Sequence, residues 1–165
     1  LDKGTFPGAL GSMHLNTMAA KTWSFKYAGT QEFRDIMSQV IVNARCLAEE
    51  LTNYGFRIVS GGTDNHLLVA DLRGKNITGQ VFQEALDSIG ITVNKNMIPF
   101  DPQSPSITSG VRIGLTAVTQ RGLKEEQIKQ IASIMNKVAN APHDEKNIAD
   151  CKEEAQALIA NYPLY

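Results

Sequence analysis

The chain has 165 residues, and its 16 lysines and arginines against 17 aspartates and glutamates give a formal net charge of −1. Hydrophobic residues make up 42% and charged residues 20%, which is typical of a globular protein with one cohesive core. This balance argues against binding to nucleic acid or to an anionic membrane surface, and no apolar stretch approaches the ~18 residues of a membrane span. Cys46 and Cys151 show neither metal-ligand spacing nor a disulfide framework, so we expect a reducing cytoplasmic setting.

Helical periodicity dominates the first third of the chain. Residues 13–26 contain neither glycine nor proline and are compatible with a helix. A longer helix is predicted at 33–51, where apolar residues recur every three or four positions and charged residues fall mostly off that stripe. Gly55 is placed to end this helix.

The middle of the chain alternates short strands with turns and one helix. Strands are predicted at residues 56–59, 66–72, 91–93 and 111–113. Thr78 can cap the helix between them, which ends near Gly90. His66 follows the turn-rich segment 60–65, and we expect its side chain to cap that turn by hydrogen bonding. Residues 94–110 form a long loop with three prolines, and such loops are often functional in compact domains.

Two amphipathic helices complete the chain, at 124–138 and 144–160, the second bounded by Pro142 and Pro163. These elements predict an α+β fold, in which helices pack on a small, mostly antiparallel sheet and one or two long helices precede it.

Arg112 is the candidate functional residue that the local pattern singles out. Side chains alternate along a strand, so Arg112 faces away from its apolar neighbours Val111 and Ile113. Gly110 and Gly114 permit close approach, and a guanidinium in this position suits bidentate capture of a carboxylate. The alternative is a surface arginine on an edge strand.

Short motifs spread over the whole chain form a specific set. In chain order they are Phe6-Pro-Gly8, Ala19-Ala-Lys21, Ser60-Gly-Gly-Thr-Asp-Asn-His66, Asn76-Ile-Thr-Gly79, Asn94-Lys-Asn96, Asp101-Pro-Gln-Ser-Pro105, Ser109-Gly-Val-Arg-Ile-Gly114, Thr119-Gln-Arg-Gly122 and Tyr162-Pro-Leu-Tyr165. With these motifs the chain resembles the C-terminal portion of serine hydroxymethyltransferase (glycine hydroxymethyltransferase), a fold-type I enzyme that uses pyridoxal 5'-phosphate (PLP). The resemblance implies a homodimer that interconverts serine and glycine, with tetrahydrofolate as the one-carbon acceptor.

The same resemblance implies two parts of the chain. Residues 1–52 correspond to the tail of the large PLP-binding domain and a connecting long helix, and residues 53–165 to the C-terminal small α+β domain. Arg112 matches the arginine that holds the α-carboxylate of serine or glycine. Gly11 matches the first of two glycines whose N–H groups meet the cofactor phosphate of the neighbouring subunit, and Ser12 replaces the second.

Four further residues match the family's folate site. Asn96 is similar to the residue that hydrogen-bonds the pterin ring of tetrahydrofolate, with a loop-stabilising asparagine as the alternative. Ser104, Pro105 and Ser106 match a loop tripeptide assigned to folate contact, although the family usually has an aromatic residue where Ser106 stands. A plain turn is the alternative for this tripeptide.

The family binds PLP through the lysine of a Thr-Thr-His-Lys loop, which this sequence lacks. We therefore expect the isolated chain to be inactive and to need the missing N-terminal part of the same enzyme. Two alternatives stay open, and departures from the family pattern at Ser12, Asn16 and Leu115 favour the first of them. One is a non-catalytic amino-acid-binding or dimerisation module. The other is a folate-independent aldolase for β-hydroxy amino acids, which would keep Arg112 without needing Asn96.

Overall fold

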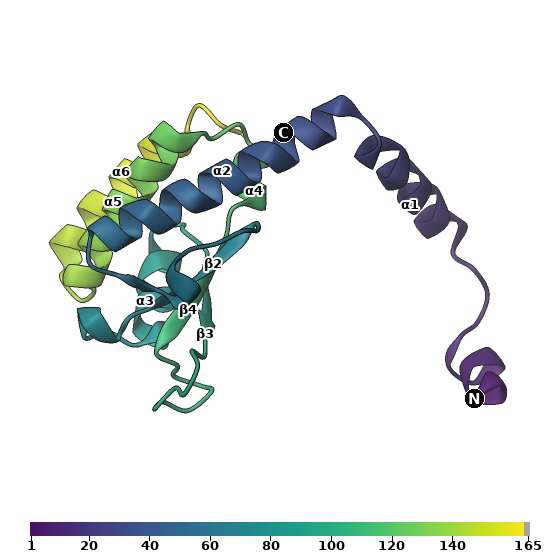
Figure 1. Cartoon of the computed structure of the whole chain (residues 1–165), viewed down its shortest axis with the longest axis horizontal. Helices are drawn as coiled ribbons and strands as arrows, with labels where there is room; N and C mark the ends of the chain where they lie inside the picture. The colour runs from purple at the N-terminus through teal and green to yellow at the C-terminus, as the bar shows by residue number, and fades with distance from the viewer. Residues whose placement is uncertain (164–165) are drawn as a thin grey trace. The chain divides into compact units, whose positions relative to one another are not determined.

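The computed structural model describes residues 1–163, so Leu164 and Tyr165, which end the last motif and the predicted small domain, lie outside the described residues (Figure 1). Contacts divide the chain into two compact units, which meet between Asp35 and Ile36. The boundary at 52/53 predicted from the resemblance concerns domains of a longer enzyme, and it stays a prediction.

The first unit is helical and leaves most of its large apolar side chains exposed. It holds a short irregular helix η1 (Gly4–Ala9), helix α1 (Leu15–Ala28) and the first turn of α2 (Gln31–Asn53). No residue of α1 is buried. Large exposed side chains include Phe6, Leu10, Met13, Leu15, Met18, Trp23 and Phe25. The helix predicted at 13–26 is confirmed, with a start two residues later.

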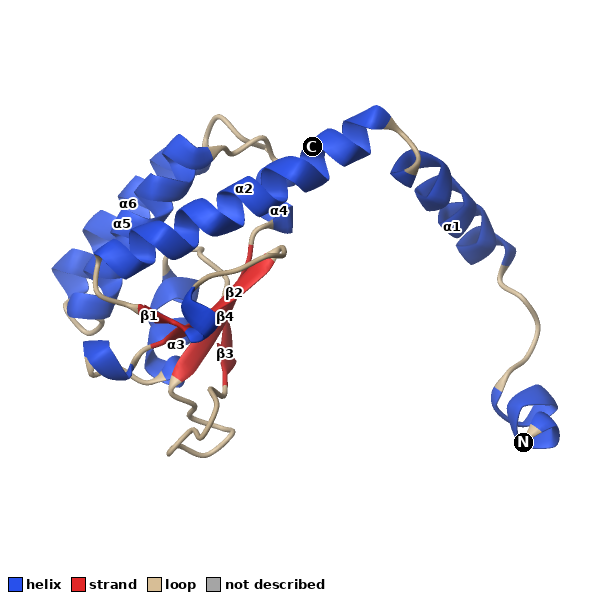
Figure 2. Cartoon of the chain, in the orientation of Figure 1, coloured by secondary structure: helices blue, strands red, loops and turns tan. Residues whose placement is uncertain are grey.

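The second unit contains a four-stranded sheet in which every pair is antiparallel (Figure 2). The strands are β1 (Arg57–Ile58), β2 (Leu67–Asp71), β3 (Asn94–Asn96) and β4 (Gly110–Gly114), in the spatial order β1-β2-β4-β3. The predicted α+β class with a small antiparallel sheet is therefore confirmed.

One predicted strand is wrong, because residues 91–93 do not pair. The N–H of Ile91 donates to the carbonyl of Leu86 at 3.0 Å and so closes the end of a helix instead of joining a ladder. Pairing with β4 begins one residue after the predicted strand, at Asn94. The N–H of Lys95, in the middle of β3, donates to Oε1 of Gln83 at 2.8 Å, which ties the strand to the neighbouring helix.

Helices supply the rest of the second unit. They are α3 (Gly79–Ser88), α4 (Thr116–Gln120), α5 (Glu125–Asn140) and α6 (Glu145–Ile159), with short 3-10 turns η2 (Val59–Gly61) and η3 (Arg73–Lys75). Thr78 caps α3 as predicted, since its Oγ1 accepts from the N–H of Val81 at 3.3 Å. Gly55, at φ +85°, follows the end of α2. Among residues 1–163, no helix is both long and apolar enough to cross a membrane.

The core lies between one face of the sheet and the helices. From the strands it takes Leu68, Ala70, Val111 and Ile113, and from the helices Leu47, Leu51, Phe82, Leu86, Ile128 and Met135. The core residues of β2 and β4 alternate with residues that face the other way. The opposite face of the sheet, which we call the outer face, therefore carries the intervening residues of each strand, Arg112 among them.

Candidate functional site

Arg112 stands at the middle of β4 and is exposed, whereas Val111 and Ile113 on either side are buried. It lies directly opposite Val69 of β2 and Asn94 of β3. Because β4 pairs on both sides, Arg112 does not lie on an edge strand as the alternative required. The sheet therefore presents its guanidinium from a central strand on the outer face.

An open hollow of about 570 Å³ surrounds Arg112. Its lining consists of His66, Leu67, Thr92, Val93, Asn94, Arg112 and Gly114. None of these residues is acidic, and no carboxylate within residues 1–163 forms an ion pair with Arg112. A cation without an internal counterion, next to polar side chains, is suited to bind an external carboxylate.

The two glycines that flank Arg112 have different surroundings. A Cβ on Gly110 would lie 2.6 Å from Cγ2 of Ile98 and 2.9 Å from the carbonyl oxygen of Ala70. A Cβ on Gly114 would meet nothing within 4 Å. The space beside Gly110 is therefore filled by Ile98 of the neighbouring loop, and of the two glycines only Gly114 leaves open space beside Arg112.

Asn96 shares the outer face with Arg112. Asn94 pairs with Arg112 and Asn96 with Gly110, and residues two apart on a strand point to the same side. Nδ2 of Asn96 donates to the carbonyl oxygen of Met97 at 2.6 Å. This contact is the one expected of a loop-stabilising asparagine, so the folate role of Asn96 stays a prediction.

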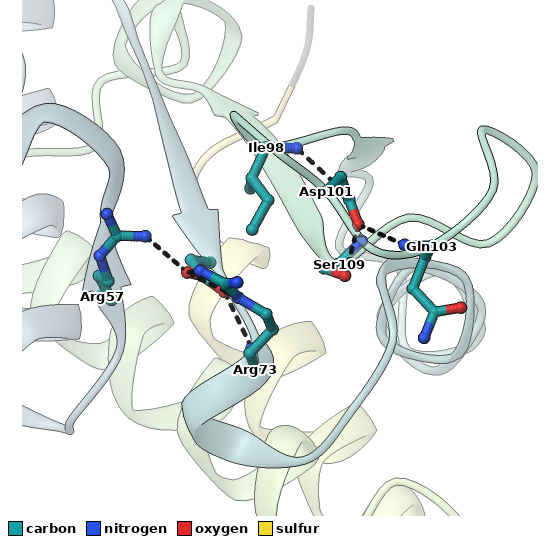
Figure 3. Close-up of polar contacts among 7 residues, drawn as sticks. Arg57, Arg73, Ile98, Asp101, Gln103 and Ser109 are labelled. Atoms are coloured by element: carbon teal, nitrogen blue, oxygen red, sulfur yellow. Dashed lines mark hydrogen bonds and ion pairs between the residues drawn. The ribbon is translucent and has the colours of Figure 1, made fainter.

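The loop from 97 to 109 is organised by Asp101 (Figure 3). Its Oδ2 accepts from the N–H groups of Ile98 and Ser109, at 3.1 and 2.9 Å. Its Oδ1 accepts from the N–H of Gln103 at 2.9 Å and from Oγ of Ser109 at 2.6 Å. Burial acts to raise the pKa of this carboxyl, but the hydrogen bonds outweigh it and lower the pKa to about 2.

Ser104, Pro105 and Ser106 form an exposed turn within this loop. The hydroxyls of Ser104 and Ser106 are hydrogen-bonded at 2.8 Å, and the carbonyl of Ser104 accepts from the N–H groups of Ile107 and Thr108. These hydrogen bonds within the turn are the ones expected for the alternative, a plain turn. The folate contact of the three residues stays a prediction.

Gly11 and Ser12 lie in the first unit, between η1 and α1, and both are exposed. A Cβ on Gly11 would meet nothing within 4 Å. Their contact with a cofactor phosphate stays a prediction. The hollow at Arg112 does not fit PLP by itself, because no lysine lines it to bind the cofactor's aldehyde.

The prediction for the His66 side chain is wrong. The turn before β2 is held by Thr63 and Asn65, since Oγ1 of Thr63 accepts from the N–H of Asn65 at 3.2 Å, and Oδ1 of Asn65 from the N–H of Leu67 at 3.0 Å. These short side chains bond to nearby backbone more readily than an imidazole does. The exposed His66 instead lines the hollow of Arg112.

Asn43 is a buried polar residue that sequence reasoning missed. Its Nδ2 donates to Oγ1 of Thr119 and to the carbonyl of Leu123, both at 2.9 Å. Oγ1 of Thr119 donates to the carbonyl of Leu115 at 2.7 Å, and the N–H of Leu115 to the carbonyl of His66 at 2.8 Å. These bonds connect α2 to the rim of the hollow. An asparagine beside the apolar stripe of a predicted helix is the signal that points to such a role.

A second carboxylate, that of Asp71 at the end of β2, pairs with Arg57 of β1 and Arg73 of η3, the two arginines labelled in Figure 3. It is 2% exposed, and Arg73 and Arg57 form ion pairs with it at 2.8 and 2.7 Å. The hydrogen bond from Arg73, opposed by burial and aided by Arg57, lowers the pKa of Asp71 to about 2. Because both arginines are committed to this buried carboxylate, we regard the cluster as structural.

The family model described as serine hydroxymethyltransferase matches residues 1–135 of the 165-residue chain. The match covers most of the motifs in both units, including the whole of β4 with Arg112 and the 97–109 loop. This chain belongs to the serine hydroxymethyltransferase family, a lineage of PLP-dependent transferases.

Proposed function

We propose that this chain is the C-terminal part of a serine hydroxymethyltransferase, which interconverts serine and glycine and passes the hydroxymethyl carbon to tetrahydrofolate. One observation carries the proposal. Arg112 projects from a central strand into an open hollow, where none of the described residues neutralises it. The family match over residues 1–135 supports the reaction class.

Arg112 binds the α-carboxylate of serine or glycine in this proposal. The planar guanidinium donates two parallel N–H···O bonds, which fix both the position and the rotation of the amino acid. Charge-assisted bonds of this kind contribute about 1.5–3 kcal/mol each. Asn94 and His66 line the same hollow and can contact the remaining polar atoms of the substrate.

Tetrahydrofolate binds beside the amino acid, at Asn96, Ser104, Pro105 and Ser106. Asn96 shares the outer face with Arg112, which supports neighbouring sites for the two substrates. Ser106 offers a hydroxyl where the family usually offers a ring, so we expect hydrogen bonding in place of stacking at this position.

The cofactor is held mainly by the N-terminal part of the enzyme, which supplies the lysine. From this chain, Gly11 and Ser12 reach the PLP phosphate of the neighbouring subunit, which makes the homodimer the active form. The isolated chain is therefore inactive. The two cysteines, which are both free, are compatible with a reducing cytoplasm.

The test is to substitute Arg112 in the full-length enzyme that carries this chain. Arg112→Ala should lower kcat/KM for serine by about 100-fold or more, since two charge-assisted bonds are lost. Arg112→Lys should recover only part of this loss, because an ammonium cannot form the bidentate pair. Arg45→Ala removes an exposed arginine whose ion pair with Asp64 spans 3.9 Å, and it is the matched control. Near-normal turnover by Arg112→Ala would exclude this role.

A second candidate is a folate-independent aldolase for β-hydroxy amino acids. The bond from Nδ2 of Asn96 to Met97 favours it, because this amide is already used inside the loop. Cleavage of a β-hydroxy amino acid that is unchanged by added tetrahydrofolate would support the aldolase. Serine turnover that requires tetrahydrofolate would support the hydroxymethyltransferase.

A further inference from the structure

We propose that Asp101 is a positioning residue, whose carboxylate holds the 97–109 loop in the conformation in which Asn96 and the Ser104–Ser106 turn can bind one ligand together. The inference rests on the proposed folate role of this loop and adds the residue that makes the two segments act as one site.

The hydrogen bonds of Asp101 reach both flanks of the candidate ligand residues. Ile98 lies two residues after Asn96, and its N–H donates to Oδ2 at 3.1 Å. Gln103 directly precedes Ser104, and its N–H donates to Oδ1 at 2.9 Å. Ser109 follows the turn and donates to both oxygens, through its N–H and its hydroxyl. A single carboxylate therefore sets the spacing between the two segments.

We call the hydrogen bonds of Asp101 to Ile98, Gln103 and Ser109 the clamp. Two of these partners, Ser109 and Ile98, are themselves held against the sheet. Ser109 is 4% exposed, and its carbonyl accepts from the N–H of Leu72 at 2.9 Å, just beyond β2. Ile98 is also 4% exposed and packs against Gly110, the first residue of β4. Asp101 thus connects the exposed tip of the loop to the strand that carries Arg112.

Between these anchors the tip of the loop is exposed, whereas Thr108, next to Ser109, is 2% exposed and its carbonyl accepts from the N–H of Gly79 in α3 at 3.0 Å. Residues 102 to 106 are all exposed, and so is Phe100, at 100%. Loss of the clamp should therefore release the loop while leaving the apolar core intact. Asp71 is expected to behave differently. It is 2% exposed and pairs with arginines from two other elements, so its loss should weaken the fold itself.

The first arm of the test measures the clamp on the 165-residue chain. Hydrogen exchange is compared for Asp101→Ala, Asp101→Asn and the unaltered chain. Asp101→Ala should lower protection of the Ile98 and Ser109 amides by about tenfold or more, with Val111 in β4 unchanged. Asp101→Asn keeps one acceptor oxygen and should lie between the two. Unchanged protection in both variants would overturn the inference.

The second arm measures steady-state kinetics in the full-length enzyme. Asp101→Ala should raise KM for tetrahydrofolate about tenfold or more, with kcat and KM for serine changed less than about twofold. Asp101→Asn should recover part of the loss. Asp71→Asn is the matched control, and it should lower the melting temperature without changing KM for tetrahydrofolate. A parallel rise in both KM values would overturn the positioning role.

The two arms distinguish this inference from the proposed function. An unaltered enzyme that turns over serine without tetrahydrofolate would refute the folate reaction and, with it, the ligand assigned to the loop. Lost amide protection in the Asp101 variants would still support the clamp in that case. Folate-dependent turnover with a normal KM in Asp101→Ala would uphold the proposed function and refute the positioning role.

Discussion

Asn94 and Arg112 lie directly opposite each other on the antiparallel pair of β3 and β4, with both side chains on the outer face. Residues paired in this way have Cβ atoms about 4.5–5.5 Å apart, so one small ligand can contact both. The 97–109 loop, which Asp101 organises, connects the two strands.

The buried amide of Asn43 should contribute to stability. Asn43→Leu removes the donors to Thr119 and Leu123 and leaves buried acceptors unpaired, at a cost of about 1–3 kcal/mol. Urea unfolding of the two proteins measures the difference. Asn53→Ala changes an exposed asparagine at the end of the same helix and should shift the midpoint much less. Equal midpoints for Asn43→Leu and the unaltered chain would contradict the network.

Stability should fall in acid because of Asp71. The carboxyl has a pKa of about 2 in the folded state against an ordinary value of 3.8, so its contribution is complete above about pH 5 and is lost as pH falls towards 2. The contribution is about 1–2 kcal/mol, since the two arginines are half exposed. Urea midpoints at pH 7 and pH 3 should differ more for the unaltered chain than for Asp71→Asn. The same pH dependence in both would assign the acid sensitivity to other groups.

The two glycines beside Arg112 offer a matched pair of substitutions. Gly110→Ala places a methyl group 2.6 Å from Ile98 and should destabilise the chain by about 1–3 kcal/mol. Gly114→Ala adds the same group in open space. Because it meets no other atom, the melting temperature should stay within about a degree or two of that of the unaltered chain. Thermal unfolding followed by circular dichroism tests both. Equal losses at the two positions would show that close packing is not what requires Gly110.

The apolar side chains of the first unit should cause self-association. Trp23 is 66% and Phe25 77% exposed on α1, a helix with no buried residue. Large apolar side chains exposed in this number mark interaction surfaces. Light scattering at tens of micromolar should give a dimer or larger species. The double variant Trp23→Ser, Phe25→Ser should shift it towards the monomer, whereas Phe100→Ser, on the 97–109 loop, should not. A strict monomer for the unaltered chain would refute association through residues 13–51.

Much of the fold could be predicted because single segments carry their own signals. The apolar period of α5 and the Thr78 cap of α3 are local properties, and so is the alternation that turns Arg112 away from the core. By contrast β3 is Asn-Lys-Asn, which has little β propensity and is a strand only because β4 pairs with it.

The parts of the candidate site that could not be predicted depend on contacts between distant segments. Asp101 and Ser109 are eight positions apart, and Asn43 lies 76 positions from Thr119. No periodicity or spacing rule connects such residues. The prediction for His66 is wrong for a related reason. Whether Thr63, Asn65 or His66 bonds to the turn depends on the detailed path of its backbone.

The hydrogen bond between Gln83 and Lys95 covers part of one edge of the sheet. β3 is one of the two edge strands of the sheet, and edge strands present unpaired N–H groups to which a strand of another molecule can add. Here the Gln83 side chain occupies the N–H of Lys95, at the centre of a strand only three residues long, and the lysine adds a charge. The Gln83 side chain thereby protects this edge of the sheet against the addition of a strand from another molecule.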